Sequence, residues 1–187
     1  MQGLLSLSRS IDRLLGFIAQ IGAWCGFLLM LAVCTDVVTR YFGVPKPFGM
    51  NSTQLQESEY WLHTFLFALV LGYAYTRQAH VRIDLVRDKL PLKTKYLIEI
   101  LGCLLFLIPY CGIVGELCWN YIAASYNSGE ASKSTIGLSH LWLLKSSLLF
   151  MYGLLVLAGI SQLIKSLAGF MGVLPDRMVA ETLGGDM

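Results

Sequence analysis

Charged residues inside apolar stretches are the residues of this chain whose types and spacing could support chemistry. Asp36 and Arg40 are four residues apart, so on a helix they share one face and can form an ion pair. Glu116 lies in a later apolar stretch, and Lys145 lies early in the next one, at a depth where the two can pair. A charge surrounded by hydrocarbon is costly and usually marks a partner or a pathway. These residues are too few to line a substrate path, and the alternative interpretation is that Asp36, Arg40 and Lys145 only extend to water.

Cysteine is the second residue type that could support chemistry, with five copies at Cys25, Cys34, Cys103, Cys111 and Cys118. They contain no C-x-x-C pair and lie in or near apolar stretches, whereas a membrane thiol oxidase needs paired cysteines in its outer loops. We therefore interpret the cysteines as small, polarisable packing residues.

Haem binding is the chemistry that the histidines leave open. A membrane cytochrome needs two axial ligands at similar depth on facing helices, and His63 and His140 could share a depth. A haem-binding membrane anchor subunit of an oxidoreductase is therefore the alternative function. The sequence contains no phosphate loop, nucleophile elbow or zinc-ligand spacing, so we expect neither an enzyme active site nor a bound cofactor.

The composition predicts an all-α integral membrane protein. Hydrophobic residues make up 56% of the 187 residues and charged residues 14%, and the mean hydropathy is +0.62. A membrane-spanning helix needs about 20 mainly apolar residues. Four segments are predicted to span the membrane: about 14–38, 58–78, 96–124 and 141–170. We expect a single membrane domain over 1–187 with a flexible tail at 172–187. The net charge of +2 does not favour a nucleic-acid partner.

The distribution of basic residues predicts how these spans are oriented. If both chain ends are cytoplasmic, ten of the fourteen Lys and Arg residues lie inside, in line with the excess of positive charge on cytoplasmic flanks. The ten are Arg9, Arg13, Arg77, Arg82, Arg87, Lys89, Lys93, Lys95, Lys165 and Arg177. The second span opens on its outer side with the acidic residues Glu57 and Glu59 and ends in this basic inner flank. The prediction is four transmembrane helices, N-in/C-in.

Two further patterns concern packing. Gly22 and Gly26 give a G-x-x-x-G spacing in the first span, which allows another membrane helix to approach closely. Between the second and third spans, residues 81–90 mix charges with Val, Ile and Leu. As a short helix they would be amphipathic and would lie along the cytoplasmic membrane surface.

The same region resembles a known family. The chain reads A-H-V-R-I-D over 79–84 and closes at Leu90-Pro91, after a second span that opens with Glu57 and Glu59. This succession resembles the small membrane subunit of tripartite ATP-independent periplasmic (TRAP) transporters, the DctQ-like family. The length and the four-span layout are also similar to that family.

The resemblance implies a non-catalytic, multi-pass subunit of the bacterial inner membrane. In such systems a large, DctM-like membrane subunit carries the sodium and substrate sites, and a periplasmic DctP-like binding protein delivers an organic acid. The small subunit braces the large one and helps to form the docking surface, with lipid around it. We predict subunit-interface or structural roles for His80, Arg82, Asp84, Glu57, Glu59, Asp36, Arg40, Glu116, Lys145, Gly22 and Gly26.

Overall fold

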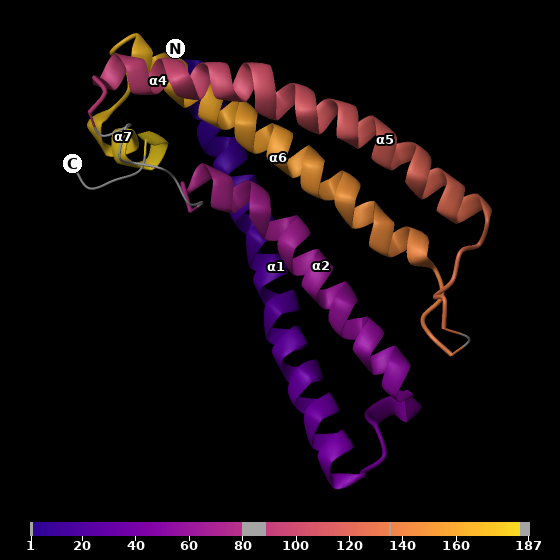
Figure 1. Cartoon of the computed structure of the whole chain (residues 1–187). Coiled ribbons are helices and arrows are strands. Elements are labelled where there is room, and N and C mark those ends of the chain that lie inside the picture. The colour runs from indigo at the N-terminus through magenta and orange to yellow at the C-terminus, as the bar shows by residue number, and fades with distance from the viewer. Residues whose placement is uncertain (1, 80–88, 135, 184–187) are drawn as a thin grey trace.

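The computed structural model describes residues 2–79, 89–134 and 136–183, and these residues form helices joined by turns and loops, with no strand among them (Figure 1). The elements are α1 (Gln2–Phe42), η1 (Pro47–Gly49), α2 (Ser52–Thr76), α4 (Leu92–Leu101), η2 (Gly102–Leu107), α5 (Ile108–Asn127), α6 (Leu141–Phe170) and α7 (Asp176–Leu183). The all-α prediction is confirmed. The expected amphipathic helix at 81–90 falls almost entirely outside the described residues and stays a prediction.

Three stretches of helix are long and apolar enough to cross a membrane: α1, the run Leu92–Asn127 and α6. The predicted second span corresponds to α2, a helix of 25 residues that is not among these three. Its first turns are polar and its apolar core is short, because the apolar residues begin only near Tyr60. The N-terminus of α2 is stabilised by a reciprocal capping box between Asn51 and Gln54.

The run Leu92–Asn127 contains a widened turn. Residues Gly102–Leu107 form a π-helical segment between α4 and α5. Pro109 follows two residues later, and a proline inside a helix lacks an N–H donor and crowds the carbonyl four residues earlier. That carbonyl belongs to Leu105, inside the π-helical segment, so we attribute the widened turn to Pro109.

The helices are arranged as two antiparallel hairpins, α1 with α2 and α5 with α6 (Figure 1). The start of α1, the end of α2, α4, the end of α6 and α7 gather at one end, which we name the terminal end. The opposite end, which we name the loop end, holds the connections at 43–51 and 128–140. Near the terminal end, Leu15 of α1 packs with Leu154 and Ala158 of α6 in a buried cluster.

Glycine allows the central contacts of α2 with its two neighbours. A β-carbon added at Gly22 of α1 would lie 2.8 Å from a methyl carbon of Val70. One added at Gly72 of α2 would lie 2.9 Å from the backbone oxygen of Leu154. Both positions therefore need a residue without a side chain, as close helix approach requires. Gly26 is less restricted, because its nearest neighbour is a Leu66 methyl at 3.4 Å.

Part of the tail at 172–187 is helical. Residues Asp176–Leu183 form α7, which starts directly after Pro175, a position at which proline favours a helix start. Met178 is buried in a cluster with Leu5 of α1 and Ala168 of α6. The apolar face of α7 therefore covers the terminal end. The amino-acid composition of this segment does not predict that contact.

Candidate functional site

A buried polar cluster joins α1 and α6 at the terminal end; it consists of Ser8, Asp12, Ser161 and Lys165. The Nζ of Lys165 lies 2.6 Å from Oδ2 of Asp12, and the Ser161 hydroxyl donates to Oδ1 at 2.6 Å. The hydroxyls of Ser8 and Ser161 are 2.8 Å apart. The spacing of four residues within each helix puts the two α1 members on one face and the two α6 members on another.

Burial makes this cluster energetically important. The side chain of Lys165 is 1% exposed, and that of its partner Asp12 is 24% exposed. An ammonium group without water needs a counter-charge to remain ionised. The Asp12 carboxylate supplies that counter-charge to Lys165 across the contact between α1 and α6.

A second set of hydrogen bonds ties α7 to the same end. Nε2 of Gln162 donates to the Thr182 carbonyl at 2.6 Å, and Nε2 of Gln78 donates to the same oxygen at 2.8 Å. Gln162 and Thr182 are fully buried. One carbonyl of α7 thus connects α6 with the residues that follow α2.

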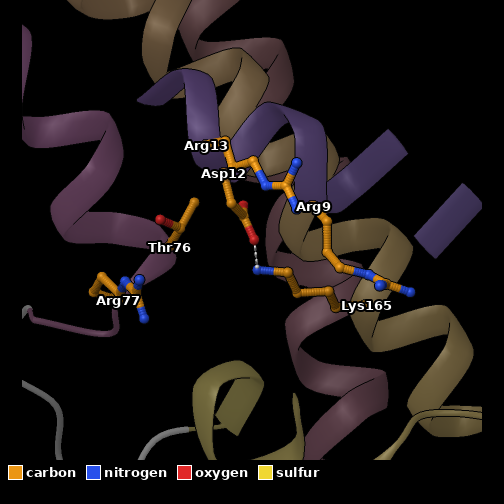
Figure 2. Close-up of a pocket in the computed structure, with 6 residues that line it drawn as sticks. All are labelled: Arg9, Asp12, Arg13, Thr76, Arg77 and Lys165. Atoms are coloured by element: carbon orange, nitrogen blue, oxygen red, sulfur yellow. Dashed lines mark ion pairs between the residues drawn. The ribbon is translucent and has the colours of Figure 1, made fainter. Parts of the chain in front are cut away.

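A small hollow of about 160 Å³ lies beside the polar cluster; we name it the basic pocket. It is lined by Arg9, Asp12, Arg13, Thr76, Arg77 and Lys165. Figure 2 shows the side chain of Lys165 extending to Asp12, with Thr76 and Arg77 coming from the end of α2 on the other side. Four of the six lining residues are cationic and one is anionic, so the pocket is suited to an anion.

Sequence reasoning missed this site because it counted Lys165, Arg9 and Arg13 only as charges that set the orientation. A usable signal was present: Ser161 and Lys165 lie four residues apart inside a strongly apolar run, as Ser8 and Asp12 do near the chain start. Such a pair predicts a polar helix face. It does not say that the two faces meet.

Asp36 and Arg40 occupy the loop end of α1. The carboxylate of Asp36 pairs with Arg40, as the spacing predicted, and also with Lys46 from the loop after α1. Asp36 is 6% exposed as a residue. The carboxylate therefore holds the loop against the end of its helix.

Glu57 joins α2 to the loop between α5 and α6. Its carboxylate accepts hydrogen bonds from the Ser132 hydroxyl and from the backbone N–H of Leu138. Nearby, the side-chain amide of Asn51 donates to the Ile136 carbonyl at 3.0 Å. This acidic residue therefore links the two hairpins at the loop end. Glu59 is different: its buried Oε1 has no hydrogen-bond partner among the described residues.

The structure corrects the expected pairing of Glu116 with Lys145. Lys145 pairs with Glu130, which follows α5, and its Nζ lies 3.8 Å from the ring centre of Tyr121. Glu116 is exposed on α5 and makes no ion pair with any described residue. The ammonium group of Lys145 holds the pKa of Glu130 below its ordinary value. Lys145 therefore lies level with the C-terminal end of α5 and the residues after it, where Tyr121 and Glu130 are, and Glu116 is not its partner.

The remaining predicted residues divide by position. Gly22 and Gly26 lie in the contact between α1 and α2. His80, Arg82 and Asp84 lie outside the described residues, so their roles stay predictions.

Metal and haem ligation find no support in the described residues. They contain no group of three or more His, Cys, Asp or Glu side chains arranged to hold a metal ion. The ring of His63 packs edge-on against Phe67, with ring centres 4.7 Å apart, and Nδ1 of His140 is 2.7 Å from the Ser139 hydroxyl.

Comparison with known families decides the identity of this fold. Residues 29–169 match the family model described as "Tripartite ATP-independent periplasmic transporters, DctQ component". The chain belongs to the DctQ family. No curated protein and no solved structure matches the chain. The matched region covers α2, α4, α5 and nearly all of α6, with about the last third of α1 at the loop end.

Family membership states the role of the molecule at a coarse level. A DctQ protein is the small membrane component of a TRAP transporter and is a non-catalytic component. Together with three helices long enough to cross a membrane, it makes this chain a multi-pass membrane protein. The haem-anchor alternative receives no support from this family. The polar cluster lies partly outside the matched region, since Ser8 and Asp12 precede residue 29.

Proposed function

We propose that this DctQ protein braces the large, DctM-like membrane subunit of a sodium-driven TRAP transporter for an organic acid. In this proposal it also helps to dock the periplasmic DctP-like binding protein. The observation that carries the bracing role is the exposed apolar surface of its long helices. In the most apolar 18-residue stretches of α1 and of Leu92–Asn127, only 11% of the residues are buried within the chain.

Large side chains make up that surface. Trp24 on α1 is 60% exposed, Phe106 is 73% exposed and Ile113 on α5 is 64% exposed. Apolar surface of this extent has to be covered by lipid or by another membrane helix. A small subunit that packs against a larger one in the bilayer accounts for both kinds of cover.

The location of charge supports bracing over transport. Among the described residues, the ion pairs lie at the terminal end, at Asp12 and Lys165, and at the loop end, around Asp36 and around Lys145. A route for a charged substrate through the membrane needs polar groups at intermediate depth. The described helices offer mainly apolar side chains there.

The proposed topology has four spans, N-in/C-in, in the bacterial inner membrane. It adds α2, the second span along the chain, to the three long apolar stretches. Helix α2 runs antiparallel beside α1 (Figure 1), and both Gly22 and Gly26 of α1 face it. If α1 crosses the bilayer, a helix packed along it crosses as well. The terminal end, with its basic residues, then lies in the cytoplasm.

The loop end then faces the periplasm and offers the docking surface. There Glu57 holds the loop at 128–140 against α2, and Lys46 is held by Asp36. These contacts give fixed positions to exposed loops, which suits recognition of a soluble protein by a preformed surface.

Reconstitution tests the bracing role. In liposomes, the chain alone should give no sodium-driven uptake of an organic acid, and uptake should require the large subunit together with the binding protein. Omitting only this chain should abolish uptake and should reduce the detergent stability of the large subunit. Uptake by the chain alone, or full uptake without it, would contradict the proposal.

A further inference from the structure

The basic pocket at the terminal end has more cationic side chains than its single carboxylate can pair with. Its one carboxylate, Asp12, is already engaged by Lys165 and by the Ser161 hydroxyl. Arg77 has its own contacts, since its Nε donates to the Tyr73 hydroxyl at 3.1 Å. The charge left over comes from Arg9 and Arg13.

Arg9 and Arg13 are exposed, lie four residues apart on α1 and line the same hollow. Neither forms an ion pair or a hydrogen bond with a described residue. Like charges at this spacing on a helix repel each other. An anion held between them would remove the repulsion, and planar guanidinium groups are well suited to a phosphate group.

The surface of α1 next to the pocket is apolar. Leu14 is 48% exposed and Phe17, one turn beyond Arg13, is 67% exposed. Arg9 and Arg13 precede the apolar run of α1, so they lie at headgroup depth when α1 spans the bilayer. Basic pockets between membrane helices at this depth bind phosphorylated lipid headgroups.

We propose that the basic pocket binds an anionic phospholipid, with Arg9 and Arg13 as the phosphate ligands and with Leu14 and Phe17 against an acyl chain. The Lys165–Asp12 ion pair forms the fixed wall of the site. The proposal needs α1 to span a bilayer, but it does not need a particular orientation, because both leaflets present headgroups. The lipid site can therefore be disproved while the bracing function stands, and the bracing function can be disproved while the lipid site stands.

The test uses the purified full chain in a neutral detergent. Native mass spectrometry measures retention of phosphatidylglycerol and of phosphatidylcholine, and the thermal unfolding midpoint is measured with each lipid and with inorganic phosphate. The expected result is selective retention of phosphatidylglycerol and a rise in the midpoint with that lipid alone. Arg9→Gln with Arg13→Gln should weaken phosphatidylglycerol binding about tenfold or more. Arg9→Lys with Arg13→Lys should weaken it less, because lysine keeps the charge but lacks the planar guanidinium group.

The matched control is Lys93→Gln with Lys95→Gln, which removes the same charge from the start of α4 at the same end of the molecule. It should leave binding unchanged. Equal losses in the two glutamine pairs would show a diffuse electrostatic effect and would overturn the site. Unchanged binding in the arginine pair would overturn it too. An equal midpoint rise with inorganic phosphate would replace the lipid by a free anion and overturn the lipid assignment. Circular dichroism of each variant confirms that its helix content matches the parent.

Discussion

At the scale of single residues, burial decides which of the ion pairs matters for stability. Lys165 is almost completely buried, whereas Glu130, the partner of Lys145, has a side chain 39% exposed. Removing one partner of a buried pair leaves a charge without compensation, which is far more costly than losing a solvated contact. The Asp12–Lys165 pair should therefore contribute more to stability than the Glu130–Lys145 pair.

The variant Asp12→Asn should destabilise the protein more than Lys165→Met does. It leaves a buried ammonium without a counter-charge, at about 3–5 kcal/mol, while Lys165→Met leaves a carboxylate that still reaches water. The double variant should be milder than Asp12→Asn alone. Unfolding of the detergent-purified chain measures these free energies, with Lys133→Gln as an exposed control. Strictly additive single effects would show that the two groups do not interact.

The Glu130–Lys145 pair should make stability depend on pH. The pKa of Glu130 is lowered in the folded state by the hydrogen bond from Lys145. Its contribution is therefore fully present above the pKa of the unfolded chain, about 4.3 for glutamate, and is lost as pH falls through the lower folded value. The stability difference between the parent and Glu130→Gln should shrink from pH 6 to pH 3. A difference that stays constant with pH would contradict the pairing. The effect is small, because the carboxylate is solvated.

At the scale of helices, glycine positions decide how closely α2 can approach its neighbours. Gly72 faces the backbone of α6, which cannot move aside as a flexible side chain can. Gly153 is a residue of α6 itself, and a β-carbon added there would have no atom within 4 Å. Gly72 of α2 and Gly153 of α6 therefore have opposite tolerance for the same substitution.

Gly72→Ala should lower the unfolding free energy by about 1–3 kcal/mol, the usual range for overpacking. Gly153→Ala should be neutral or slightly stabilising, because alanine favours the helix. Denaturant titration followed by circular dichroism compares the two. Equal effects would show that α2 does not contact α6 as closely as the structure has it.

At the scale of the molecule, the sides of the membrane on which the loops lie test whether α2 spans the bilayer. With four spans, residue 89 lies in the cytoplasm and residue 133 in the periplasm. If α2 did not cross, residue 89 would lie on the same side as the loop that follows α1.

In intact cells, cysteine at Lys89 should be shielded from an impermeant thiol reagent, and cysteine at Lys133 should be labelled. Both positions belong to turns or loops beside the helices. The parent, with its five native cysteines, supplies the background signal. Labelling at position 89 before cell lysis would contradict the four-span, N-in/C-in topology.

The sequence by itself determined the helical class, the long apolar segments and the family, because hydrophobic length and local motifs are written along the chain. It also determined the Asp36–Arg40 pair, since a spacing of four residues fixes a shared helix face. Only the tertiary structure decided which faces meet. It paired Lys145 with Glu130, folded 176–183 onto the core, and joined Asp12 to Ser161, which is 149 residues away. The physical reason is that helix periodicity orders side chains within one helix, whereas contacts between helices depend on packing at small residues such as Gly22 and Gly72.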